Sequence, residues 1–220
     1  MGLNIGGVVI ITILAIIIYF AGRWVRSGRY AISRTRGVVS RVDGMPYRVH
    51  EVHAGPQEAA DMLAALNDRA IGLLRALRGR YTRGADGARY PERRTATQQL
   101  LERYNPDSLA ENSPKDPGGD TSYTLDKGAV IAICLRDPAR AAGDIHDLDM
   151  LTFVTIHEMA HIAVKDIDHP PRFWGAFRFL LEEAEGAGVY TSVDYARTPR
   201  RYCGIQIDYN PRYDLGVKAL

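Results

Sequence analysis

The sequence predicts an α+β domain that follows a single membrane-spanning helix. An uncharged apolar run fills residues 5–21, several later stretches show helical spacing of apolar side chains, and residues 128–135 read as one short buried strand. About 200 residues follow the apolar run, which is enough for one domain with a real core. We expect a short sheet packed beside a central helix, further helices, and a tyrosine-rich C-terminal segment.

The N-terminal run has the length of a membrane anchor. Counted from Leu3 to Gly22, it can cross a hydrocarbon core of about 30 Å, and Tyr19 and Trp24 fit the interfacial aromatic belt. The competing interpretation, a cleaved signal peptide, requires a basic segment before the apolar run, and residues 1–4 carry no basic side chain. We therefore expect an uncleaved transmembrane anchor at residues 1–22.

Charge next to the span predicts its orientation. Basic side chains follow the span and none precedes it, so the positive-inside rule places the rest of the chain on the cytosolic side. Residues 23–56 are interpreted as a basic juxtamembrane stem, and residues 57–220 as the folded domain. The arginines of the stem are Arg23, Arg26, Arg29, Arg34, Arg36 and Arg41.

Overall composition gives no obvious sign of a nucleic-acid binder, although it does not exclude one. The chain holds 28 basic and 26 acidic residues, a formal net charge of +2, and much of the basic excess lies beside the predicted span. Nucleic acid is therefore not an expected partner. Its two cysteines, Cys134 and Cys203, have no metal-like spacing and suit a reducing compartment, with one disulfide as the alternative.

The first part of the domain shows a long helix and later a hairpin. Apolar spacing predicts helices over residues 56–80 and 95–104, whereas residues 105–120, with three prolines and paired glycines, predict a loop. Residues 122–125 are expected to pair with residues 129–134. His50 and His53 are interpreted as surface or stem residues.

One motif carries chemistry. His157 and His161 are four residues apart in a run of helical character, so both imidazoles face one side and can bind one metal ion. Glu158 follows the first histidine, where its carboxylate can reach a metal-bound water. Zinc accepts nitrogen ligands, and its catalytic sites use three protein ligands plus water. The pattern favours a hydrolytic zinc site.

The surrounding sequence supports a buried helix. Aspartates suited to a helix N-terminus precede an apolar run, and buried polar groups require partners. A bound metal supplies such partners; the alternative is an amphipathic helix that exposes two histidines. The apolar or small residues at helical spacing are Leu148, Leu151, Thr155, Met159 and Ile162.

The third ligand is expected from the segment after this helix. His169 stands between the helix end, near Lys165, and a new helix opened by Pro170 and Pro171, so it can turn back to the metal. The alternative is a glutamate of the helix expected over residues 171–187. Those candidates are Glu182, Glu183 and Glu185.

The two histidine-bearing segments together resemble the compact SprT-like and WLM zinc proteases. The resemblance rests on His157-Glu158-x-x-His161 followed by His169 and the aromatic pair Phe173-Trp174, about a fifth of the chain. Residues 155–190, with flanks 120–124 and 202–205, also resemble uncharacterised WLM-type proteins of large DNA viruses of algae. The usual glycine near the third histidine is absent here, which leaves the loop geometry and substrate preference open.

This resemblance implies a small zincin-like metallopeptidase domain that binds Zn²⁺. The metal ligands would be His157, His161 and His169, and Glu158 would be the catalytic base. In a viral protein the cytosolic side would correspond to the virion interior. Carboxylates that orient the ligands would come from Asp147, Asp149, Asp166 or Asp168. A tyrosine that assists the oxyanion would come from Tyr190, Tyr195, Tyr202 or Tyr209.

The function expected is therefore a membrane-anchored zinc metallopeptidase that hydrolyses peptide bonds of a protein or peptide substrate. One alternative is a catalytically inactive, zinc-stabilised and membrane-anchored scaffold or interaction module. Another is a hydrolase of non-peptide substrates that uses the same residues.

Overall fold

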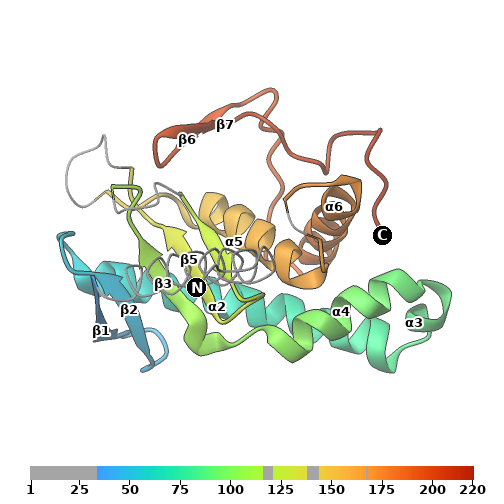
Figure 1. Cartoon of the computed structure of the whole chain (residues 1–220), viewed down its shortest axis with the longest axis horizontal. Helices are drawn as coiled ribbons and strands as arrows, with labels where there is room; N and C mark the ends of the chain where they lie inside the picture. Colours follow the sequence, from blue (N-terminus) through green and yellow to red (C-terminus); the bar gives the residue numbers. More distant parts are fainter. Residues whose placement is uncertain (1–33, 116–120, 138–143, 167) are drawn as a thin grey trace, which may run out of the picture.

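The computed structural model describes residues 34–115, 121–137, 144–166 and 168–220. These residues form the expected mixed α+β fold, in which a five-stranded sheet packs against helices (Figure 1). The helices are α2 (Pro56–Leu77), α3 (Asp86–Arg89), α4 (Pro91–Arg103), α5 (Leu148–Ala163) and α6 (Pro171–Gly186), with a π-helical turn at Arg78–Arg83 and a 3-10 turn at Pro106–Ser108. The strands are β1 (Thr35–Val39), β2 (Pro46–His50), β3 (Leu109–Asn112), β4 (Tyr123–Leu125), β5 (Val130–Cys134), β6 (Arg200–Tyr202) and β7 (Ile205–Ile207).

The sheet has the order β1-β2-β3-β5-β4, so β4 is a terminal strand. β2, β3 and β5 pair in parallel, whereas β1 with β2 and β4 with β5 form antiparallel pairs. The expected pairing of residues 122–125 with 129–134 is confirmed by the β4–β5 register. β6 and β7 form a separate hairpin, which lies over α5 in Figure 1.

Two parts of the sheet differ from the sequence-based expectation. β3 lies within residues 105–120, which were expected to form a loop because of their prolines and paired glycines. Its four residues are instead buried in the middle of the sheet. β1 and β2 lie in the segment assigned to the stem, and β2 pairs with β3 of the domain. His50, expected at the surface, is 1% exposed, and its backbone amide donates to Glu111.

α5 is the central helix of the core. It packs against α2, α4, α6, β4 and β5, and twelve of its side chains are buried. Asp147 caps its start, because the aspartate carboxylate accepts a hydrogen bond from the Met150 amide at 2.9 Å. Burial on nearly all sides explains why this helix shows little amphipathic character in its sequence.

The predicted membrane span at residues 1–22 lies outside the described residues. Within the described part of the chain, no helix is both long and apolar enough to cross a bilayer.

Candidate metal centre

α5 presents two histidines on successive turns. The ring centroids of His157 and His161 lie 5.0 Å apart, as expected for residues four positions apart on one helical face. Both side chains are half-buried, in contrast to the fully buried residues that surround them on the helix. The helix therefore turns two imidazoles toward one opening while the rest of its surface is packed.

His169 completes a group of three imidazoles. Its ring lies 5.0 Å from that of His157 and 4.9 Å from that of His161, and the Nε2 atoms of His157 and His169 are 3.1 Å apart. One nitrogen from each histidine lies within 4.8 Å of the others. Tetrahedral zinc with nitrogen ligands at about 2.0–2.1 Å spaces those nitrogens by about 3.4 Å, so the three residues fit a zinc ion.

The glutamates considered as alternative ligands are engaged elsewhere. Glu182 pairs with Arg178 at 3.0 Å, and Glu185 pairs with Arg212 at 2.8 Å. Glu183, the third alternative, is buried. Its carboxylate accepts from the Tyr81 hydroxyl at 2.8 Å. The geometry therefore favours His169 as the third ligand.

A lysine ties the segment of the third histidine to the metal helix. Lys127 Nζ donates to the backbone carbonyls of His161, Val164 and Asp166, at 3.1, 3.3 and 2.8 Å. A cation at a helix C-terminus is favourable because it satisfies carbonyls that have no helical partner. Sequence reasoning missed Lys127, because it sits in the β4–β5 turn with no motif around it.

Phe173 packs against all three imidazoles. Its ring lies 4.9 Å from that of His157, 4.3 Å from that of His161 and 4.5 Å from that of His169. The first turn of α6 therefore provides a buried apolar support that holds the three rings together.

Glu158 is held from the sheet side. Its side chain is 3% exposed, and its Oε2 accepts a hydrogen bond of 2.9 Å from Thr124 Oγ1 on the edge strand β4. Thr124 was not identified from the sequence, because threonine in a short strand carries no sign of its partner. The contact fixes a buried carboxylate next to the first histidine.

The four candidate aspartates have different roles, and Asp166 accepts from Lys127 through its backbone carbonyl. Asp147 caps α5, and Asp149 pairs with Arg69 at 2.5 Å, so both act on the helix start. Asp168 adopts a left-handed conformation with φ 63° directly before His169. The negative charge of Asp168 raises the pKa of His161, but burial and the charges of His169 and Lys127 lower that pKa by more. Asp168 is thus the candidate that acts on a ligand.

Burial sets the protonation state of the two α5 histidines. Desolvation and the neighbouring imidazoles lower the pKa of His157 to about 3, and desolvation and the charges of His169 and Lys127 lower that of His161 to about 4. Both rings are therefore neutral near pH 7, the form that binds a metal.

We expect the metal-free protein to lose stability as the pH falls below about 6.5. In that range unfolded histidines take up protons, whereas His157 and His161 in the folded state remain neutral down to about pH 3 and 4. The effect is at most about 1.4 kcal/mol per pH unit for each histidine. Urea unfolding of the metal-free chain at pH 6.5 and 4.5 measures it. An unchanged pH dependence in His161→Asn would contradict the assignment.

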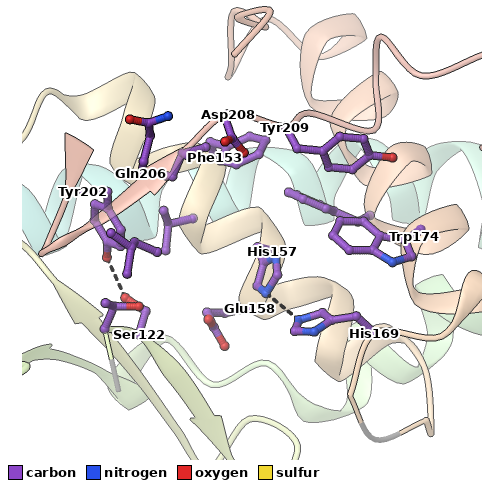
Figure 2. A pocket seen from close by; sticks show the side chains of 15 residues that line it. Ser122, Phe153, His157, Glu158, His169, Trp174, Tyr202, Gln206, Asp208 and Tyr209 are labelled. Atoms are coloured by element: carbon purple, nitrogen blue, oxygen red, sulfur yellow. Dashed lines mark hydrogen bonds between the residues drawn. The ribbon is translucent and has the colours of Figure 1, made fainter. Parts of the chain in front are cut away.

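A cleft of about 380 Å³ opens next to the histidines. Figure 2 shows His157 and Glu158 at its centre, His169 and Trp174 on one side, and Ser122 and Tyr202 on the other. The hairpin β6–β7 and the residues that follow it form the remaining wall. The lining residues are Thr121, Ser122, Phe153, Val154, His157, Glu158, His169, Trp174, Phe177, Tyr202, Ile205, Gln206, Ile207, Asp208 and Tyr209.

The structure separates the four tyrosines considered for an oxyanion role. Tyr190 and Tyr195 are buried near Phe153 and are not among the lining residues, whereas Tyr202 and Tyr209 line the cleft. Burial raises the pKa of Tyr202, so its hydroxyl remains protonated. That hydroxyl lies 2.6 Å from Ser122 Oγ on the Glu158 side of the cleft (Figure 2).

The two cysteines form a disulfide, Cys134–Cys203. The sequence favoured two free thiols, as in a reducing compartment, and the structure instead has the alternative of one disulfide. Cys134 ends β5, and Cys203 lies in the β6–β7 turn, so the bond attaches the hairpin wall of the cleft to the sheet. The 69-residue separation encloses α5, α6 and all three histidines.

Comparisons with known proteins find relatives in viruses. The chain is 31% identical to uncharacterized protein R325 of Acanthamoeba polyphaga mimivirus over 199 residues, which cover 90% of this chain and 92% of that protein. It is 32% identical over 72 residues to uncharacterized protein 136R of Invertebrate iridescent virus 6, covering 33% of this chain and 40% of the relative. It is 35% identical over 86 residues to uncharacterized protein 042R of Invertebrate iridescent virus 3, covering 38% and 50%. No family model matches the chain, and no solved structure matches it significantly.

Proposed function

The chain belongs to the family of viral proteins that includes uncharacterized protein R325 of mimivirus, and we propose that it is a membrane-anchored zinc metallopeptidase. One observation carries the proposal. Three histidine nitrogens lie within 4.8 Å of one another beside a buried carboxylate, Glu158, in an open cleft. Three nitrogen ligands leave one tetrahedral position open, which is typical of catalytic rather than structural zinc.

His157, His161 and His169 would hold the metal. Bound zinc would lower the pKa of a water molecule toward neutrality and polarise the scissile carbonyl. Glu158 would accept the water proton and later deliver it to the leaving amine. Thr124 keeps the Glu158 carboxylate in place through its 2.9 Å hydrogen bond. Tyr202 is the tyrosine whose hydroxyl lies on the Glu158 side of the cleft, and it would assist the oxyanion.

The polypeptide substrate would bind along β4. This strand terminates the sheet, and within the described part of the chain no strand pairs with its outer side. An extended segment can add to such an edge through backbone hydrogen bonds. Because Thr124 of β4 contacts Glu158, a segment paired there would lie next to the base.

The domain would be zincin-like, in keeping with the SprT-like and WLM resemblance of the two histidine-bearing segments. Residues 1–22 would anchor it in a membrane, with the domain on the cytosolic or virion-interior side. The substrate would then be a protein that reaches that side of the membrane.

Zinc content tests the proposed ligand set. We expect the full chain, purified in detergent and dialysed, to retain close to one zinc ion per molecule by elemental analysis. His169→Ala should lose most of it, because two histidines alone hold zinc weakly. His53→Ala is the matched control, since His53 lies outside the group of three. Zinc retained in His169→Ala would reject His169 as a ligand, and a folded wild-type chain without zinc would reject the proposed function.

A further inference from the structure

Building on the proposed function, we propose that the cleft selects polypeptide segments with a bulky apolar side chain beside the scissile bond. Aromatic and leucine-like side chains would be preferred, and acidic ones rejected. The pocket that receives this side chain is defined by Phe153, Trp174, Phe177, Ile207 and Tyr209, and is called the aromatic pocket below.

The aromatic pocket adjoins the reacting position. Trp174 lies 5.6 Å from the ring of His169, and Phe177 lies 5.1 Å from that of His157, so the pocket shares a wall with two proposed ligands. Figure 2 shows Trp174 beside His169, with Tyr209 above it. If a substrate side chain packs against Trp174, the backbone of that residue would therefore lie next to the proposed metal site.

The rings of the pocket are held by one another. Trp174 meets Tyr209 edge-on at 5.2 Å, and Phe153 lies 5.0 Å from Phe177. The Tyr209 hydroxyl donates to Asp214 at 2.8 Å, which orients its ring toward Trp174. A preformed aromatic wall gives an apolar side chain contact at little cost in ordering.

Two exposed apolar side chains at the rim of the cleft are consistent with an apolar ligand. Ile205 is 50% exposed and Tyr209 is 37% exposed, and both line the cleft. Exposed apolar side chains gathered at a hollow surface typically mark a binding site. The hairpin that carries Ile205 is attached by the Cys134–Cys203 bond, so this wall is fixed to the sheet.

Charge and size define the side chain that fits. Among the described lining residues there is no lysine or arginine, and the carboxylates are Glu158 and Asp208. An acidic side chain in the aromatic pocket would thus find no lysine or arginine to pair with, and Asp208 would repel it. The volume of about 380 Å³ is at the small end of ligand pockets, which suits an extended segment and not a folded domain.

Cleavage of a peptide library tests the preference. The zinc-loaded full chain in detergent would be given extended peptides of mixed sequence, with mass spectrometry to locate cut sites. We expect phenylalanine or leucine beside the cut to raise kcat/KM about 10- to 100-fold over alanine, and aspartate to lower it. Efficient cleavage without such a preference would overturn the inference while leaving the proposed function intact.

Variants of the pocket wall link the preference to these residues. Trp174→Ala should reduce the advantage of phenylalanine over alanine about tenfold, whereas Trp174→Phe, the matched control, should retain most of it. Ile207→Trp should fill the pocket from the hairpin side and exclude bulky side chains. An unchanged preference in both Trp174→Ala and Ile207→Trp would contradict the assignment of the pocket.

A binding measurement separates this inference from the proposed reaction. Zinc-loaded Glu158→Gln would be titrated with single peptides of the series, and the fluorescence of Trp174 followed in a Trp24→Phe background, because the chain has two tryptophans. Tighter binding of phenylalanine than alanine peptides supports the pocket even if no cleavage occurs. Equal binding of both, with no change at Trp174, would reject it.

Discussion

Glu158→Gln is expected to lower peptidase activity by at least 10²- to 10⁴-fold while zinc remains bound. The amide has nearly the shape of the carboxylate and can still accept from Thr124 Oγ1, so the buried position stays filled. It cannot accept a proton from water. The loss should therefore appear in kcat, measured with a fluorogenic peptide, and not in the zinc content of the full chain.

The matched control for this change is Glu182→Gln. Glu182 lies on α6 and pairs with Arg178, and it does not line the cleft. We expect its kcat to stay near that of the wild type. If Glu158→Gln retained full activity with zinc in place, Glu158 could not be the base. If neither the wild type nor the variant cleaved any peptide, a zinc-stabilised scaffold would become the better description.

Loss of the Cys134–Cys203 bond is expected to lower the free energy of unfolding by about 4 kcal/mol. The bond closes a loop with a sequence separation of 69 residues, and by the chain-entropy argument a loop of this size restricts the unfolded chain by about that amount. Urea unfolding of the oxidised chain and of Cys134→Ala/Cys203→Ala would measure the difference. We also expect faster amide exchange in β6 and β7, because an isolated two-stranded hairpin has marginal stability.

The reduced wild-type chain is the control for the double variant. Reduction and substitution should produce the same loss, since both remove the same covalent link. Equal stability of the oxidised and reduced chains would contradict a contribution of the bond to folding. Mass analysis without reductant establishes the bond itself.

The disulfide and the predicted orientation favour different compartments. A disulfide is typical of oxidising compartments, whereas the arginines after the predicted span predict the cytosolic side. Thiol labelling in cells would distinguish an oxidising from a reducing location.

Local sequence patterns predicted the helices α2, α4, α5 and α6 and the core of the site, but not the short helix α3. The four-residue spacing of His157 and His161 requires only helical geometry, and α5 has the expected extent. The helix that follows His169 begins at Pro171, as its prolines indicated. These features depend on residues within one or two turns of each other, where spacing alone determines which side chains meet.

The sequence by itself determined the motif helix, the hairpin of β4 and β5, and an α+β domain, because each rests on local periodicity or turns. Only the tertiary structure decided which distant residues serve the site. Thr124, Lys127 and Tyr202 reach it from separate elements, and β3 extends because neighbouring strands pair with it on both sides. Such contacts depend on how the chain returns on itself, and no spacing in the sequence encodes that distance.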